Sequence, residues 1–87
     1  MKTAQNSTII DVRSESEFAG RHVPGAINIP LDQLPQRIEE IRNLPKPVIV
    51  YCMSGNRSGM AMNLLMQQGI NEVVNGGGIS DMLNGKN

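Results

Sequence analysis

Residues 48–58 read VIVYCMSGNRS, and this stretch decides the fold. Its first four residues form a continuous apolar run behind Pro47, which is typical of a strand buried on both faces of a sheet. The residues after Cys52 are small and polar and include Gly55, so they predict a turn. A helical pattern of apolar residues follows at once. The stretch therefore predicts a buried strand that turns directly into a helix.

Similar patterns surround this unit on both sides. Strands are predicted at residues 8–12, 26–29, 48–51 and 72–74, where short apolar runs are bounded by polar, proline or glycine residues. Three helices are predicted between the strands. The first begins at Ser14, which forms a capping box with Glu17; the second has Asp32 as its candidate cap; the third ends at Gly69. Apolar spacing predicts the inner faces of two of these helices. In the second helix the inner face consists of Leu31, Leu34, Ile38 and Ile41, and Pro35 is tolerated in the first turn. In the third helix it consists of Ala61, Leu64 and Leu65.

This alternation of strands and helices predicts an α/β fold with a central parallel sheet flanked by helices on both faces. The chain has 87 residues, which is the size of one small domain, and it contains no internal repeat, low-complexity tract or linker. We therefore expect residues 1–87 to form a single domain. Its core must consist of aliphatic residues and methionine, because the only aromatic residues are Phe18 and Tyr51.

Composition excludes several classes of function. Eight basic and eight acidic residues give no net charge, and aromatic residues for base stacking are nearly absent, so we expect no nucleic-acid partner. No apolar run approaches the roughly 18–20 residues of a membrane span, and residues 1–7 lack the apolar stretch of a signal peptide. We expect no membrane association and, by default, a cytoplasmic location; a periplasmic one would follow if a signal peptide had been removed.

The single cysteine, Cys52, is the candidate reactive residue. It cannot form an internal disulfide, and together with the single histidine, His22, it is too little for a zinc site, so we expect no metal. Ligands of α/β sheets bind beyond the carboxyl ends of the strands, where the start of the next helix favours an anion. We therefore expect Cys52 to be a thiolate with a lowered pKa, assisted by Arg57 if that side chain folds over the loop. The alternative interpretation is an inert, buried strand residue.

Other polar residues are predicted to support this loop. Asp11 and Arg13 stand at the end of the first predicted strand, and we expect them to form a buried or semi-buried ion-pair network that braces the site. From the carboxyl end of its strand, Asp11 could also approach the loop. His22 lies beside a Pro-Gly turn, 30 residues from Cys52 in the sequence, and is interpreted as structural. The glycines at 76–78 either line the opposite wall of the entrance or form a simple turn.

Four segments in order resemble the rhodanese family. Residues 52–58, with cysteine, glycine, arginine and serine at 52, 55, 57 and 58, are similar to its active-site loop. Residues 9–13, followed by Glu17 and Phe18, resemble its Asp-x-Arg segment and the helix after it. Residues 22–26, which read HVPGA, are similar to a signature of the family. Residues 73–79 resemble its late glycine segment. Many members have a tryptophan shortly after that segment, where this chain has Met82.

The resemblance implies a sulfurtransferase that takes sulfane sulfur from a donor such as thiosulfate and passes it to a thiophilic acceptor such as cyanide, a thiol or a protein. Cys52 would be catalytic and would hold the sulfur as a persulfide. No cofactor is implied. The substrate-binding residues would be those of the loop, namely Met53, Ser54, Gly55, Asn56, Arg57 and Ser58.

Two other functions remain as alternatives. Cysteine-based phosphatases and arsenate reductases also place a cysteine and an arginine around an anion-binding loop, but such phosphatases have five residues between the two, whereas four separate Cys52 from Arg57. Domains of this fold also serve as binding modules, usually after loss of the cysteine. Because Cys52 is present, a persulfide carrier for a partner protein ranks above an inert module.

Overall fold

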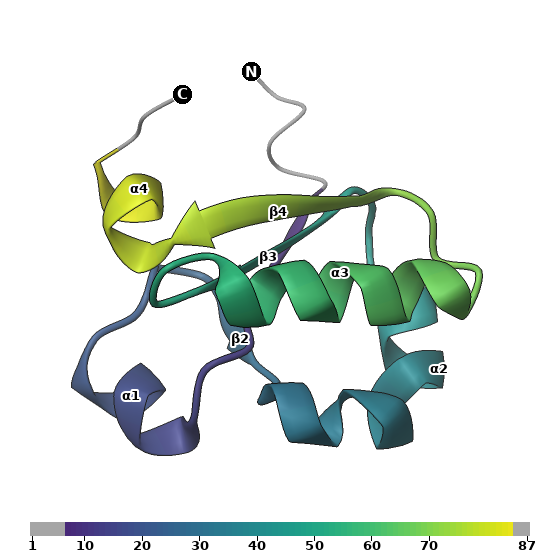
Figure 1. The fold of residues 1–87 in the computed structure, drawn as a ribbon, viewed down its shortest axis with the longest axis horizontal. Helices are drawn as coiled ribbons and strands as arrows, with labels where there is room; N and C mark the ends of the chain where they lie inside the picture. The colour runs from purple at the N-terminus through teal and green to yellow at the C-terminus, as the bar shows by residue number, and fades with distance from the viewer. Residues whose placement is uncertain (1–6, 85–87) are drawn as a thin grey trace.

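The structure is a computed structural model that describes residues 7–84, and its centre is a four-stranded parallel sheet in the order β2-β1-β3-β4 (Figure 1). In chain order the elements are β1 (Thr8–Asp11), α1 (Glu15–Gly20), β2 (Ile27–Asn28), the 3₁₀ helix η2 (Leu31–Arg37), α2 (Ile38–Arg42), β3 (Val48–Cys52), α3 (Asn56–Gln67), β4 (Val73–Gly78) and α4 (Ile79–Leu83). This confirms the α/β class with a central parallel sheet. The expectations for residues 1–6 and for the last three residues lie outside the described part.

All four predicted strands are confirmed, and β4 is longer than its sequence suggested. Glycine is poorly suited to strands in isolation, yet β4 continues through three of them. Tyr51 and Cys52 of β3 pair with Gly77 and Gly78, and this pairing with the neighbouring strand extends β4 through the glycines. A shift in that register after Val50 leaves Gly76 as an extra residue in β4, as in a β-bulge.

The first helix follows its prediction, and the second does not. Ser14 caps α1 and forms the capping box with Glu17, which confirms that local signal. The apolar stripe that predicted one helix corresponds to η2 followed by α2, with Leu34, Ile38 and Ile41 buried. Asp32 as the cap was wrong: the helical segment already begins one residue earlier, after Pro30, so Asp32 lies inside the first turn.

The third helix, α3, connects the reactive loop to the core. Ala61 and Leu65 are fully buried and Leu64 is half-buried, which confirms the predicted inner face. The chain leaves the helix through Gly69, whose φ of +87° lies in the left-handed region that glycine adopts without strain.

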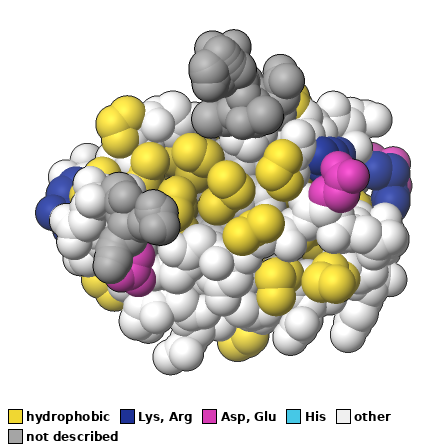
Figure 2. Space-filling view, turned by 90° about the horizontal axis from the view of Figure 1, so that it is seen from above, with side chains coloured by type: hydrophobic (Ala, Val, Ile, Leu, Met, Phe, Trp, Pro, Cys, Tyr) yellow, Lys and Arg dark blue, Asp and Glu magenta, His cyan; other side chains and the backbone are white. Residues whose placement is uncertain are grey.

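Apolar side chains pack on both faces of the sheet. The larger cluster joins Ile10 and Val50 of the sheet to residues of η2, α2 and α3, and the smaller one joins Tyr51 to Ile79 and Met82 of α4. Figure 2, which views the molecule from the side on which β4 and α4 lie in Figure 1, shows apolar side chains gathered there with charged ones toward the margins. Within residues 7–84, no helix is long and apolar enough to cross a membrane.

Candidate functional site

Cys52 lies at the carboxyl end of β3, at the entrance of a tight loop that leads into α3. Its Sγ accepts the backbone N–H of Gly55 at 3.0 Å and that of Ser58 at 3.4 Å, and the hydroxyl of Ser58 lies 3.5 Å away. Gly55 makes this turn possible, since its φ is +102°. The thiol is only 1% exposed and belongs to the larger core cluster, but the donors aimed at its sulfur distinguish it from an inert core residue.

Two opposing effects act on the pKa of the Cys52 thiol. Burial acts to raise it, because a thiolate loses hydration in the interior. Hydrogen bonds from the hydroxyl and amide of Ser58, and from the amides of Gly55 and Ser54, act to lower it. The hydrogen bonds outweigh burial, so the pKa lies below the usual value for cysteine. The loop therefore favours an anionic sulfur at this position.

The glycine segment at the end of β4 lies directly against this loop. A Cβ added to Gly78 would come within 2.5 Å of the carbonyl oxygen of Met53, and one added to Gly55 within 3.6 Å of the Cα of Gly77. The contact at Gly78 leaves no room for a side chain, whereas the one at Gly55 is an ordinary van der Waals distance, and there it is the left-handed φ that favours glycine. The glycines therefore form a wall of the loop and are more than a turn into α4.

Arg57 does not stand free over the loop. Its guanidinium forms a two-pronged ion pair with Glu17 of α1, with distances of 2.9 Å from Nη1 to Oε1 and 3.0 Å from Nη2 to Oε2. Arg57, assisted by the amide of Ser14, lowers the pKa of Glu17 from 4.5 to about 2. The charge expected to meet an anionic ligand is therefore already neutralised by a carboxylate from another helix.

Asp11 and Arg13 form the expected buried ion pair. Arg13 Nη2 lies 2.7 Å from Asp11 Oδ2, and the two side chains are 3% and 0% exposed. The hydroxyl of Tyr51 donates to the same carboxylate at 2.8 Å and accepts the amide of Val23 at 3.0 Å. Because Tyr51 precedes Cys52 in β3, this network braces the strand end from which the loop departs.

The remaining loop residues differ in how they face solvent. Met53, Ser54 and Asn56 are exposed around the turn, whereas Ser58 is buried against the sulfur. His22 is exposed and stacks on Phe18 at 3.8 Å between ring centroids, and its Nδ1 lies 2.9 Å from the Phe18 carbonyl oxygen, in keeping with its interpretation as structural.

Two residues that contact the site, Glu17 and Asn75, were not predicted from the sequence to do so. Glu17 was seen only as part of a capping box, and nothing in the spacing shows that it meets Arg57, 40 positions later. Asn75 hydrogen bonds to Ser58 and to the carbonyl of Gly55. The available signal was its position two residues after Val73, which places both side chains on the same face of the strand.

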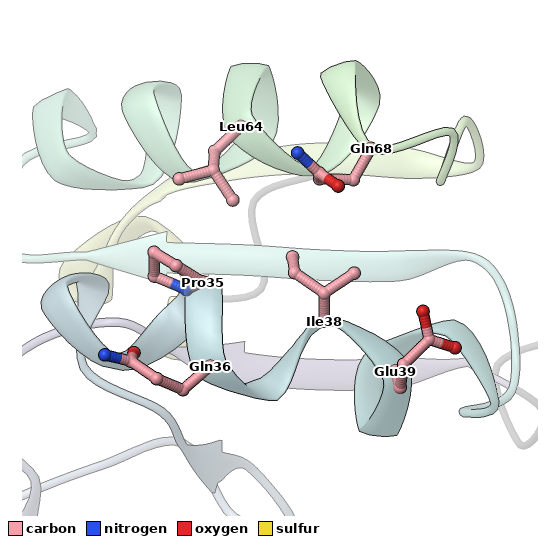
Figure 3. Close-up of a pocket in the computed structure, with 6 residues that line it drawn as sticks. All are labelled: Pro35, Gln36, Ile38, Glu39, Leu64 and Gln68. Carbon is pink, nitrogen blue, oxygen red and sulfur yellow. The ribbon is translucent and has the colours of Figure 1, made fainter.

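Two hollows lie near the helices. The one in Figure 3 has a volume of about 300 Å³ and lies between α3 and the η2–α2 segment, away from the loop; its lining residues are Pro35, Gln36, Ile38, Glu39, Leu64 and Gln68. The other, of about 430 Å³, reaches Arg57 and is lined by Val12, Ser14, Pro30, Leu31, Asp32 and Arg57. We place the site at the sulfur rather than in the first hollow, because no loop residue lines that hollow. Within residues 7–84, no group of three or more His, Cys, Asp or Glu side chains could hold a metal ion.

The family model for the rhodanese-like domain matches residues 1–84. The chain belongs to the rhodanese-like family. It is 48% identical over 71 residues to the uncharacterized protein YqhL of Bacillus subtilis, covering 82% of this chain and 56% of the relative. It is 40% identical over 74 residues to the thiosulfate sulfurtransferase PspE of Escherichia coli, covering 84% of this chain and 71% of PspE.

Solved structures show the same rhodanese-like fold. A rhodanese with anions from E. coli superposes with a TM-score of 0.78 at 40% identity, covering 86% of this chain and 89% of that one. The chain spans little more than half the length of the B. subtilis relative.

Proposed function

We propose that this rhodanese-like chain is a sulfurtransferase in which Cys52 carries sulfane sulfur as a persulfide. The observation that carries this proposal is the pair of backbone N–H groups, from Gly55 at 3.0 Å and Ser58 at 3.4 Å, that point at the sulfur. Such donors stabilise a thiolate and also a terminal sulfur anion, which are the two charged states of the cycle. The name of the relative PspE, a thiosulfate sulfurtransferase, supports the same class of reaction.

The proposed reaction has two nucleophilic steps. The Cys52 thiolate attacks the outer sulfur of thiosulfate; a new S–S bond forms, the S–S bond of thiosulfate breaks, and sulfite leaves with the electron pair. An acceptor such as cyanide, a small thiol or a protein thiol then attacks the outer sulfur of the persulfide. The S–S bond to Cys52 breaks and the thiolate is regenerated, so charge balances in both steps without a cofactor.

Phosphate-ester hydrolysis fits the site less well. A phosphatase of this kind needs its arginine to bind the oxygens of the transferred phosphoryl group. Here Arg57 is paired with Glu17, and the loop is one residue shorter than the phosphatase spacing. Sulfane sulfur, a single atom, requires neither a free guanidinium nor a larger ring.

Mass spectrometry of the intact protein tests the proposal. After incubation with thiosulfate and removal of excess reagent, we expect the mass to increase by one sulfur atom, and cyanide should return it to its original value with release of thiocyanate. Because Cys52 is the only cysteine, protein alkylated beforehand with iodoacetamide is a selective control and should gain nothing. The proposal fails if neither thiosulfate nor inorganic polysulfide adds sulfur that cyanide removes. If the same protein also hydrolyses p-nitrophenyl phosphate in a vanadate-sensitive reaction, a phosphatase replaces it.

Glu17→Gln should improve the use of an anionic donor. The change removes a negative charge near the loop and leaves the Arg57 guanidinium without its carboxylate partner, while Gln can still accept from the Ser14 amide in the capping box. We expect KM for thiosulfate to fall by roughly 3–10-fold with kcat little changed, which is the size of one or two charge contacts in a partly exposed site.

Glu15→Gln is the matched control, since Glu15 is an exposed carboxylate of the same helix. Steady-state kinetics at a series of ionic strengths should show that the gain from Glu17→Gln shrinks as salt rises. An unchanged or higher KM in Glu17→Gln would mean that Arg57 serves only to join α1 to α3.

A further inference from the structure

Asn75 is an exposed polar residue of β4 on the side of the sheet that α3 covers. Val73, two residues earlier and therefore on the same face of the sheet, packs against the larger apolar cluster. Asn75 instead meets the start of α3, just before Gly76 interrupts the pairing with β3. Its contacts join the glycine segment to the loop that holds Cys52.

The orientation of the Asn75 amide is determined by its neighbours. Its oxygen accepts the backbone N–H of Gly77 at 2.9 Å and the hydroxyl of Ser58 at 2.7 Å, while its Nδ2 donates to the carbonyl of Gly55 at 3.3 Å. A reversed amide would place N–H against N–H at Gly77 and oxygen against oxygen at Gly55. The group that faces the Ser58 hydroxyl is therefore an acceptor.

Ser58 has one hydroxyl proton and three acceptors around it. Its Oγ lies 2.7 Å from Asn75 Oδ1, 3.1 Å from the Gly55 carbonyl oxygen and 3.5 Å from Cys52 Sγ. A proton donated to Asn75 cannot also be donated to the sulfur. In the thiol form this arrangement is satisfied, because the S–H can donate to Ser58 and Ser58 to Asn75; in the thiolate form the sulfur and the amide compete.

We propose that Asn75 is a positioning residue for Cys52, which competes with the sulfur for the hydroxyl proton of Ser58 and holds the Gly55 end of the loop against β4. This inference rests on the proposed function only in taking Cys52 as the reactive group. Asn75 acts on the sulfur through Ser58 and Gly55, to which its side chain hydrogen bonds. Its role is to restrain the anionic character of the sulfur that the loop amides promote.

Two variants separate this role from that of a simple clamp. Asn75→Leu removes the nearer of the two acceptors that compete with the sulfur and leaves the neutral Gly55 carbonyl at 3.1 Å. A thiolate then draws the Ser58 hydroxyl proton more readily, and the thiol pKa should fall by about half to one pH unit. Asn75→Asp keeps an acceptor and adds a negative charge, so the thiol pKa should rise by a similar amount. Both variants lose the bond from Nδ2 to Gly55. Because the charge of Asp raises the thiol pKa whatever the role of Asn75, the fall in Asn75→Leu, and its dependence on the Ser58 hydroxyl, separates proton competition from a clamp.

The measurement is the rate of alkylation by iodoacetamide as a function of pH, on the full chain, with circular dichroism to confirm folding. Asn63, an exposed asparagine of α3, provides the matched controls Asn63→Leu and Asn63→Asp, which should not move the midpoint. In a Ser58→Ala background, Asn75→Leu should lose its effect, because no hydroxyl proton remains to be redirected.

Opposite shifts in the two Asn75 variants support the inference; shifts in one direction, or none beyond those of the Asn63 controls, overturn it. If Asn75→Asp does not fold, Asn75→Leu with and without Ser58→Ala decides the question alone. Alkylation needs no sulfur donor. Opposite shifts in a protein that never gains sulfur from thiosulfate would therefore overturn the proposed function and leave the role of Asn75 intact.

Discussion

Cys52→Ser should abolish sulfur transfer and leave the fold in place. The nucleophile in the proposed reaction is a thiolate, and a serine hydroxyl at the same position stays protonated at neutral pH and is a poor nucleophile toward sulfur. We expect turnover of thiosulfate and cyanide to fall by about 10³-fold or more, which is the usual scale for loss of a covalent nucleophile. Thiocyanate formation is the measurement.

The substitution is mild for the surrounding structure. Oxygen is smaller than sulfur, and it can accept hydrogen bonds from the same amides of Gly55 and Ser58. Thermal unfolding should therefore still be cooperative in Cys52→Ser. Met60→Leu, at a 58% exposed position of α3, is the matched control and should keep turnover within a factor of about two, as substitutions at exposed sites usually do. Turnover in Cys52→Ser within tenfold of the wild type would contradict the assignment of Cys52, because no second cysteine could replace it.

The parts of this molecule that could be predicted from the sequence are those determined by neighbours in the chain. The capping box of Ser14 and Glu17 depends on contacts three residues apart, and the passage from β3 through Gly55 into α3 depends on an apolar run and one left-handed glycine. Such signals keep their meaning in most tertiary contexts. They were enough to place Cys52 at the end of a buried strand and at the start of a helix.

The parts that could not be predicted depend on packing between distant segments. Glu17 meets Arg57 across 40 positions and Ser58 meets Asn75 across 17, and no periodicity reports such distances. The same applies to the glycines of β4, which form a strand because β3 offers them partners. The consequence for function is direct: the arginine that the sequence assigned to an anionic ligand has a carboxylate partner in the structure.

Asp11→Ala should be the most destabilising single change at the site. Asp11 is fully buried and accepts from the side chain of Arg13, from its backbone amide at 2.9 Å and from the hydroxyl of Tyr51. Its removal leaves a guanidinium that is 3% exposed without a counter-ion, a situation that costs about 3–5 kcal/mol. The total stability of a domain of this size is roughly 5–10 kcal/mol, so urea denaturation should show the variant partly unfolded at 37 °C or close to it.

Further variants test whether the unpaired charge of Arg13, rather than lost packing, lowers the stability of Asp11→Ala. Asp32→Ala removes an exposed carboxylate and should change the free energy of unfolding by no more than about 0.5 kcal/mol. If the unpaired charge of Arg13 is responsible, then Asp11→Ala combined with Arg13→Met should be more stable than Asp11→Ala alone, because no buried charge remains. A double variant as unstable as the single one would show instead that β3 depends on the bond from Tyr51 to Asp11. In that case Tyr51→Phe alone, which deletes the hydroxyl and keeps the ring, should reproduce most of the loss, since that hydroxyl is the group through which Tyr51 hydrogen bonds to Asp11 of β1.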